Sequence, residues 1–357
     1  MEFGAPSFSR GRIDKAGDTV LQAGEPPSLA DYTIALGVVD DWRASHSYPL
    51  QIIRKTLTNR AKRVSSGAIV AQRLKRLESI VNKLGREPHM KLSQMQDLGG
   101  CRAIMPTVAE VDELVRIHKD AWDKAPSRHE LHHFKDYVAN PKASGYRSVH
   151  LIYKFRTENP NRAAHNGQRI EVQIRSKLQH VWATAVEVVG AFRKQALKSG
   201  QGSEEWQRLF TLMGSVLAKK EQRPLVPNTP DGAALVQEIT SVSEQIKAEQ
   251  FLAGCSEAAV YIEKSRKRAV AYLIVLNVEE RRVHILTQDS MLVANEKYAE
   301  MEKKNRDLPQ LQTVLVSVDS LGALRTAYPN YYLDVGEFLK ELRAVIGPFR
   351  IVLGNKV

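Results

Sequence analysis

The stretch FKDYVANPKASGYRSVHLIYKF, residues 134–155, predicts a loop that leads the chain into a buried strand. Apolar residues recur through residues 149–155, as they do in a strand that packs on a core. Just before the strand, Gly145 permits a tight turn or a close approach to a ligand. Tyr146 and Arg147 follow it, and an aromatic ring beside a guanidinium group can stack on a base and bind a phosphate. An ordinary hairpin loop has the same composition, so this stretch alone leaves both interpretations open.

A second strand is predicted from RIEVQIRS, residues 169–176. Its apolar residues face one way, and a polar set faces the other: Arg169, Glu171, Gln173 and Arg175. A surface strand alternates in the same manner. An acid among polar neighbours on one face is, however, also typical of a catalytic sheet surface.

Residues 66–84 predict a strongly basic helix. Its apolar positions recur at helical spacing and form a stripe of Ile69, Leu77, Ile80 and Leu84. Ser79 and Lys83 are four residues apart and share a face. If a strand leads into this helix, Arg73 and Lys75 project together because they are two residues apart. A solvated basic helix face is the alternative interpretation.

The remaining elements follow from hydrophobic periodicity and from turn residues. A short buried strand that carries Arg102 is predicted at residues 101–105, a β-hairpin around residues 278–280, and a last strand at 313–318. Helices are predicted over residues 28–45, 50–62, 108–123, 177–196, 204–219, 232–253, 291–304, 319–327 and 335–346.

The 357 residues are enough for two domains or three. The segment 220–231 contains three prolines and predicts a domain boundary. We therefore expect an α+β protein with four segments: a flexible basic N-terminus (1–28), a main domain (29–220), a linker and connecting helix (221–253) and a small α+β domain (254–357).

The formal net charge of +12 and the pI near 9.6 favour a polyanionic partner such as nucleic acid or nucleotides. Two cysteines, Cys101 and Cys255, exclude a disulfide framework and a zinc site built on several cysteines. This cysteine content favours a reducing cytoplasm. The N-terminal sequence predicts no signal peptide, and no apolar run is long enough to predict a membrane span.

Two separated acids, Asp97 and Glu171, each lie beside a predicted strand and among lysines and arginines. Carboxylates near strand ends can hold Mg²⁺ together with substrate phosphates, and arginines can bind phosphates or stack on a purine. This combination favours phosphoryl or pyrophosphoryl transfer from a nucleotide. Taken singly, Asp97 also fits a capping residue and Glu171 a salt-bridge partner. Motifs for P-loop, dinucleotide, zincin and zinc-finger sites are missing.

Four motifs in order resemble the synthetase domain of the RelA/SpoT family. They are RLKRLESIVNKLGR from residue 73, DLGGCRAI from residue 97, DYVANPKASGYRSVH from residue 136 and EVQIRSKLQHVWA from residue 171. The resemblance covers roughly residues 50–220. It implies a nucleotidyltransferase-like mixed sheet flanked by helices, and transfer of pyrophosphate from ATP to a ribose 3′-hydroxyl, usually of GDP or GTP.

The resemblance also implies a role for individual residues. Arg73 and Arg102 would flank the ATP adenine, and Asp97 would bind Mg²⁺. Glu171 would complete the metal site or act as general base, and Tyr146 would stack on the acceptor base as part of the catalytic set. The ATP phosphates would be held by Lys75, Ser79 and Lys83. The acceptor side would be lined by Lys142, Arg147, Gln173, Arg175 and His180. For His180 and Trp182, helix packing is the alternative interpretation.

The C-terminal segment resembles that of fused toxin–antitoxin members of this family, the CapRel type. In those proteins a zinc-finger-like domain without zinc follows the synthetase domain, and a YxxY motif blocks the ATP site. Here the matching residues are Tyr328 and Tyr331. The resemblance implies a monomeric enzyme that modifies the 3′-CCA end of tRNA, stops translation and is released by a phage capsid protein. An alarmone synthetase that uses GDP or GTP, and a non-enzymatic tRNA-binding module, are the alternatives; a hydrophobic anchor is the alternative role of the two tyrosines.

Overall fold

The computed structural model describes most of the chain: residues 4–21, 27–75, 77–124, 129–193, 203–264, 271–277, 282–290, 293–294, 297, 300–301, 304–305, 308, 311–317 and 334–354. By their internal contacts the residues form two compact units. The first unit is Met1–Tyr137 with Ser148–Lys177, and the second is Val138–Arg147 with Leu178–Val357. This division cuts the chain differently from the predicted domains, because the loop at 138–147 groups with the later helices.

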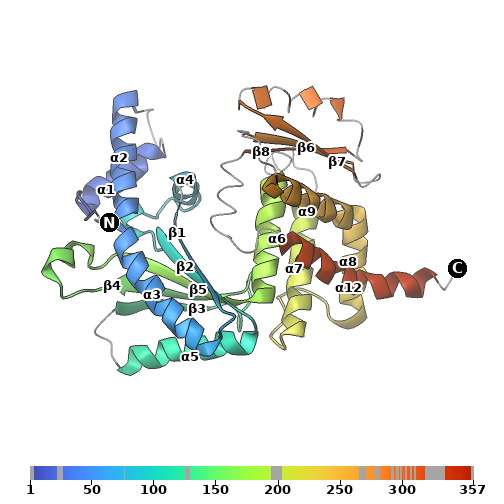
Figure 1. Ribbon diagram of the computed structural model, residues 1–357, viewed down its shortest axis with the longest axis horizontal. Coiled ribbons are helices and arrows are strands. Elements are labelled where there is room, and N and C mark those ends of the chain that lie inside the picture. Colours follow the sequence, from blue (N-terminus) through green and yellow to red (C-terminus); the bar gives the residue numbers. More distant parts are fainter. Residues whose placement is uncertain are drawn as a thin grey trace. The chain divides into compact units, whose positions relative to one another are not determined.

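A five-stranded mixed sheet forms the centre of the first unit (Figure 1). Its strands are β1 (Ile69–Leu74), β2 (Gly99–Met105), β3 (His129–Asp136), β4 (Val149–Phe155) and β5 (Arg169–Ser176). The spatial order is β1-β2-β5-β4-β3; β2 and β5 run parallel and the other neighbours antiparallel. The predicted mixed sheet and the strands at β2, β4 and β5 are confirmed.

Five helices complete the described part of this unit. They are α1 (Arg10–Val20), α2 (Leu29–Ser45), α3 (Ser47–Val64), α4 (Leu77–Arg86) and α5 (Val108–Lys124), with short 3₁₀ turns η1 (Leu92–Gln94) and η2 (Pro160–His165). The helix α3 packs on β1 and β2, and α5 packs on β5 and α3 (Figure 1). A separate apolar cluster joins α1, α2 and α4 through buried residues that include Ile13, Val39 and Ile80.

Three expectations for the first unit need correction. The N-terminal 28 residues were expected to be flexible, but Ser9 caps α1 and Ile13 is fully buried, because Ile13, Ala16 and Val20 form one apolar face. The basic segment is not one helix: the strand β1 leads into α4, which is the condition under which Arg73 and Lys75 were expected to project together. The strand β3, HELHHFKD, was not predicted, because an edge strand with partly exposed faces lacks clean alternation.

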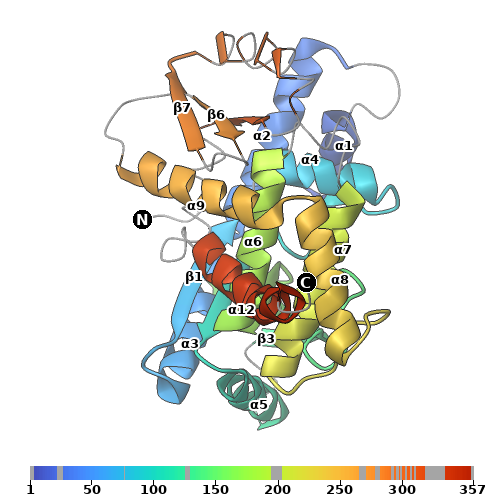
Figure 2. The same cartoon turned by 90° about the vertical axis from the view of Figure 1, so that its right-hand side faces the viewer.

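The second unit is built on helices that share one apolar core. They are α6 (Lys177–Arg193), α7 (Ser203–Lys220), α8 (Gly232–Gln245), α9 (Ala248–Lys264) and α12 (Asp334–Gly354). Trp206 and Phe210 of α7 pack on Phe251 and Phe338, with ring centroids 5.3 and 5.4 Å apart for the Trp206–Phe251 and Phe210–Phe338 pairs. The helix α12 lies against α8 and α9 (Figure 2).

A small antiparallel sheet packs on α9. Its order is β7-β6-β8, with β6 at Ala271–Asn277, β7 at Arg282–Gln288 and β8 at Leu311–Ser317. The predicted hairpin and the predicted last strand are therefore confirmed. The helix predicted over residues 232–253 is instead two helices, because Lys247 between them adopts a φ of +51°.

Tyr328 and Tyr331 lie outside the described residues. In the part of the chain that is described, no helix combines the length and the apolar character needed to cross a bilayer.

Candidate active site

Polar side chains gather on one face of the five-stranded sheet, the face opposite α3 and α5. Glu171 and Gln173 are two residues apart on β5, and both are half-buried. The register pairs Gln173 with Arg102 of β2 on one side and with His150 of β4 on the other. Because paired residues of neighbouring strands share a face, these side chains lie together. We call this surface the polar face.

Asp97 lies just before β2 and binds two lysines at once. Its carboxylate accepts from Lys75 Nζ at 2.8 Å and from Lys83 Nζ at 3.1 Å. Lys75 follows β1, and its backbone N–H donates to the Leu98 carbonyl at 2.7 Å, which fixes the segment beside Asp97. Lys83 comes from α4. The three side chains therefore meet although the sequence separates them by up to 22 residues.

The charges of this cluster are set by its surroundings. Burial alone would raise the pKa of Asp97, but the attraction and hydrogen bonds of Lys75 and Lys83 outweigh it and hold the pKa below its usual value. Asp97 is thus ionised at neutral pH. With two lysines against one carboxylate, the cluster keeps one net positive charge. Such a cluster can attract a phosphate, which would compete with Asp97 for the lysines.

Glu171 is held by hydrogen bonds from both neighbouring side chains. His150 Nδ1 lies 2.9 Å from one carboxylate oxygen, and Gln173 Nε2 donates to the other at 2.8 Å. Arg102 Nε in turn donates to Gln173 Oε1 at 3.2 Å, so one hydrogen-bonded row runs across β2, β5 and β4. A row of this kind fixes the carboxylate in one orientation.

The pKa of Glu171 reflects opposing effects. Burial raises it, the hydrogen bond and attraction of His150 lower it, and the Asp97 carboxylate raises it; the result lies below the ordinary value. Glu171 is therefore a carboxylate near neutral pH, able to accept a hydrogen bond or a proton from a substrate hydroxyl.

The donor atoms of the polar face fit Mg²⁺ held jointly with a phosphate. Asp97 and Glu171 lie close enough for one carboxylate to shift the pKa of the other. Two carboxylates, with phosphate oxygens and waters, are a common set for Mg²⁺. Among the described residues there is no group of three or more metal-binding side chains, so a site formed by protein ligands alone does not fit here.

The other predicted ATP residues are placed by the backbone. Arg73 of β1 pairs with Gly100 of β2, and Gly100 pairs on its other side with Glu171 of β5. Ser79 lies in α4, one turn before Lys83. The structure thus brings together Lys75, Lys83, Asp97, Arg102, Glu171 and Gln173 in the first unit.

The loop at 138–147 belongs to the second unit and is shaped by Gly145. This residue has a φ of +91°, and a Cβ there would lie 3.0 Å from both the Phe210 carbonyl oxygen and the Trp182 ring. Glycine is therefore required for both conformation and space. Lys142 is exposed, with Nζ 5.4 Å from the Tyr146 ring centroid, and the rings of Tyr146 and Trp182 meet edge to face at 6.3 Å.

Three residues predicted on the acceptor side are buried: Arg147, Arg175 and His180. Arg147 Nη1 lies 3.5 Å from Glu221, which also accepts from Gln179 Nε2 at 2.9 Å. This buried ion pair ties the loop to the end of α7. Trp182 is also buried and donates to the Phe210 carbonyl at 2.8 Å, as the packing alternative predicts for that side chain. The acceptor roles of the three buried residues stay predictions.

His150 is the member of the polar face that the sequence reading missed. The alternation along the strand 149–155 places His150 on the same face as Ile152 and Lys154, opposite the apolar residues Leu151 and Tyr153. The register that places it opposite Gln173 was not available from one sequence.

Part of this chain is similar in sequence to known proteins. Residues 72–195 match the model of the region found in RelA / SpoT proteins. The GTP pyrophosphokinase YwaC of Bacillus subtilis (strain 168) is 33% identical over 118 residues, which are 31% of this chain and 52% of the relative. The GTP pyrophosphokinase rsh of Brucella melitensis is 30% identical over 128 residues, or 36% of this chain and 15% of the relative. This chain thus spans about half the length of the first relative and less of the second.

Solved structures are also similar to about half of this chain, at lower identity. The small alarmone synthetase 1 of Bacillus subtilis, bound to its product pppGpp, is 21% identical, with a TM-score of 0.41 over 50% of this chain and 89% of that one. A GTP pyrophosphokinase family protein from Streptococcus pneumoniae is 22% identical, with a TM-score of 0.36 over 49% of this chain and 85% of that one. The four motifs read from the sequence all lie within residues 72–195, the segment that the family model matches.

Proposed function

We propose that this chain is an ATP-dependent pyrophosphokinase. The observation that carries the proposal is the polar face itself, where two ionised carboxylates (Asp97, Glu171) meet three cations (Lys75, Lys83, Arg102). An arrangement of charges around phosphates is the main requirement of phosphoryl transfer, since little covalent chemistry falls to the protein. The GTP pyrophosphokinases that resemble residues 72–195 support the same reaction class.

In this reaction a ribose 3′-hydroxyl oxygen attacks the β-phosphorus of ATP. The bond from that phosphorus to the bridging α–β oxygen breaks, AMP leaves, and the hydroxyl proton passes to a base. Lys75 and Lys83 would exchange their bonds to Asp97 for bonds to the triphosphate. Glu171, oriented by His150 and Gln173, would accept the hydrogen bond of the attacking hydroxyl and then its proton. Mg²⁺ held by Asp97 would neutralise phosphate charge; in its alternative role, Glu171 would complete that metal site instead of acting as the base.

We propose the 3′-CCA end of tRNA as the acceptor. The net charge of +12 supports a nucleic-acid substrate, because lysine and arginine contacts to phosphates dominate such binding. The loop 138–147, with exposed Lys142 beside the Tyr146 ring, supplies an aromatic surface and a cation for a terminal base.

A guanosine nucleotide is the second candidate acceptor. The relatives' names and the pppGpp product of the Bacillus subtilis structure favour it. Purified chain incubated with ATP labelled at its γ-phosphate, and with deacylated tRNA, GDP or GTP, separates the two. Label in tRNA is expected; label in the guanosine nucleotides alone would exclude the tRNA acceptor while leaving the pyrophosphokinase activity standing. A tRNA that lacks its terminal adenosine is the matched control and should stay unlabelled.

We further propose that the chain is an autoinhibited toxin that blocks translation in defence against phage, with Tyr328 and Tyr331 closing the ATP site and a phage capsid protein as the trigger. The motif YPNYY at residues 328–332 supports this through its likeness to the CapRel type. A trigger that binds the open state more tightly shifts the population toward it.

Cell growth tests the regulatory proposal. The Tyr331→Ala variant should stop growth without any trigger, whereas the neighbouring Tyr332→Ala variant should grow as wild type does. Equal growth of both variants, with equal protein levels and intact activity in vitro, would contradict autoinhibition by Tyr331. Co-expressed capsid proteins then identify the trigger by growth arrest that depends on Asp97.

A further inference from the structure

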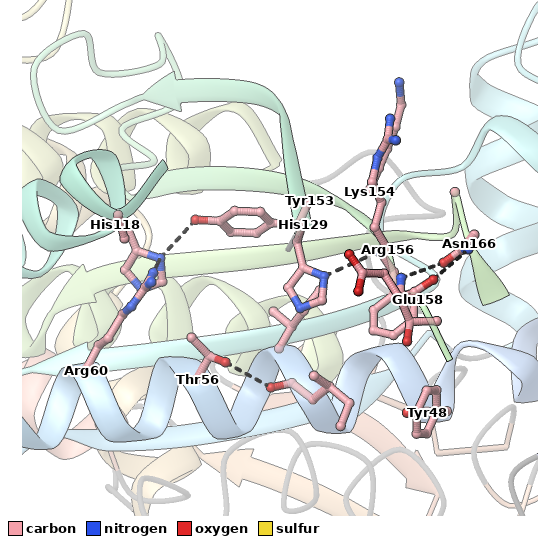
Figure 3. Close-up of a pocket in the computed structure, with 16 residues that line it drawn as sticks. Tyr48, Thr56, Arg60, His118, His129, Tyr153, Lys154, Arg156, Glu158 and Asn166 are labelled. Carbon is pink, nitrogen blue, oxygen red and sulfur yellow. Dashed lines mark hydrogen bonds between the residues drawn. The ribbon is translucent and has the colours of Figure 1, made fainter. Parts of the chain in front are cut away.

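A cavity of about 960 Å³ lies in the first unit, away from the polar face (Figure 3). It is bounded by α3, α5, the β3–β4 pair and the segment after β4. None of the side chains assigned above to ATP, acceptor or metal lines it. Tyr153 and Phe155 of β4 line it, and by strand alternation they point to the opposite face from His150 and Ile152. The cavity is therefore a separate feature of the sheet.

One face of α3 forms the long wall of the cavity. Ile53 lines it, and four further lining residues recur every fourth position: Tyr48, Ile52, Thr56 and Arg60. This spacing places them in one row along the helix. Twelve residues of helix span about 18 Å, so the row is long enough for an extended small molecule with two chemically different ends.

The Arg60 end of the row is cationic. Arg60 Nη1 lies 3.0 Å from His118 Nδ1, and the Tyr153 hydroxyl lies 2.9 Å from the same nitrogen. A guanidinium group only donates, so Nδ1 of His118 accepts and its proton is on Nε2. Burial, and then the Arg60 charge, lower the pKa of His118 to about 3, which keeps the imidazole neutral. Among the described residues no carboxylate pairs with Arg60.

His118 adds an unsatisfied donor to this end. Its side chain is 3% exposed, and Nε2 has no hydrogen-bond partner among the described residues. A buried donor without a partner destabilises the protein. Because Nε2 is itself closed to solvent, the group at this end that can meet a ligand in the cavity is Arg60. A half-buried guanidinium beside neutral groups favours an anion.

The Tyr48 end of the row is aromatic and polar. The rings of His129 and Phe155 stack at 5.0 Å and 25°, and Tyr48 meets Phe155 at 5.6 Å. Lys154 and Arg156 also line the cavity, but Glu130 already pairs with both, and the exposed Glu158 adds a negative charge. This end therefore offers ring surfaces and hydrogen-bonding edges, while the unpaired positive charge is concentrated at Arg60.

We propose that this cavity binds a nucleoside phosphate of mononucleotide size, with the phosphate on Arg60 and the base against the rings at the Tyr48 end. An anion satisfies the uncompensated guanidinium, and a planar base matches the stacked rings. A purely apolar ligand would leave the Arg60 guanidinium without an anionic partner. The proposal does not depend on the pyrophosphokinase activity.

Calorimetric titration of the full chain with AMP and GMP tests this proposal. Arg60→Gln removes a charged hydrogen-bond donor, so its affinity for the nucleotides should fall about tenfold or more. Thr56→Phe places a ring in the middle of the cavity without entering the packed core, and it should abolish the binding of both nucleotides. Arg63→Gln removes an exposed arginine three residues along the same helix and should bind as wild type does. Melting temperatures show whether each variant is folded.

One more variant shows where the nucleotides bind, and two other ligands show which of their groups are recognised. Lys75→Met, which alters the polar face, should leave the Arg60-dependent binding of AMP and GMP in place. Loss of this binding in Lys75→Met would assign it to the polar face and overturn the proposal. Inorganic phosphate or guanosine binding as tightly as GMP would exclude the proposed two-ended recognition. Affinities for AMP and GMP that are equal in folded Arg60→Gln, Thr56→Phe and wild-type protein would also overturn it.

Discussion

The two faces of the five-stranded sheet hold their positive charges differently. On the polar face, Lys75 and Lys83 are paired with the carboxylate of Asp97. On the face covered by α3 and α5, the partners of the Arg60 guanidinium within the described part of the chain are the neutral His118 and the Tyr153 hydroxyl. A paired cation must leave its carboxylate before it can hold a phosphate, whereas an uncompensated one need not. The difference suits a reaction site on one face, where bonds are exchanged, and a storage or sensing site on the other.

The largest effect is expected from Asp97→Asn. The amide keeps the shape of the carboxylate but cannot neutralise the two lysines or hold Mg²⁺, so pyrophosphate transfer should fall on the order of a hundredfold or more. Transfer of the γ-phosphate label from ATP measures it. Asp120→Asn is the matched control, because Asp120 forms an exposed ion pair with Arg116 on α5. Activity of Asp97→Asn equal to that of the control would remove Asp97 from the site.

A smaller effect is expected from Lys83→Met. This change removes one of the two cations that would hold the triphosphate, so the KM for ATP should rise about tenfold. Nucleotide binding that depends on Arg60 should be unaffected, which separates the two faces in one protein. A KM unchanged from wild type would show that Lys83 pairs with Asp97 without touching ATP.

His150→Ala should change the pH profile more than the rate at its optimum. The imidazole helps to hold the pKa of Glu171 below its ordinary value, while burial acts in the opposite direction. Without His150 the pKa of Glu171 should rise, and the acidic limb of kcat/KM should move to higher pH. His133→Ala, on exposed β3, should leave the limb in place. Identical limbs in His150→Ala and wild type would contradict the control of Glu171 by His150.

The smallest effect concerns the stability of the α3 and α5 face. Because burial depresses the pKa of His118 to about 3, the unfolded chain binds more protons than the folded one below about pH 6.5. This contribution to the free energy of unfolding is fully present above pH 6.5 and is lost as pH falls toward 3, at up to about 1.4 kcal/mol per pH unit. The free energy of unfolding, measured with urea at several pH values between 4 and 7, should therefore change less steeply with pH in His118→Phe than in wild type. A slope equal to wild type would show that His118 takes up its proton in the folded state.

Much of the main sheet could be predicted because its central strands alternate clearly. The strands β4 and β5 are buried on one side, so their apolar residues mark them, and the same alternation placed Glu171 and Gln173 on one face. The edge strand β3 has no such pattern, since both its faces are partly exposed. The break after α8 also escaped prediction, because the positive φ of Lys247 follows no glycine or proline.

Individual site residues could be named, but their partners could not. The motif around Asp97 drew attention to the acid, yet its bonds to Lys75 and Lys83 depend on how β1 and α4 return to it. Arg147 follows Gly145 in the loop and reads as a ligand-binding residue. Its partner is Glu221, 74 residues later in the sequence. No local sequence pattern can therefore predict that Arg147 is buried in an ion pair.

The order of the two units along the chain constrains how parts of this protein can be exchanged with those of relatives. The four segments of the two units alternate, so the chain crosses between them three times. A gene fragment that ends at residue 177 would encode the whole first unit together with a loop whose glycine has lost its contacts on Phe210 and Trp182. Chimeras should therefore move residues 138–147 and the helices after residue 178 together, as one cassette in two pieces.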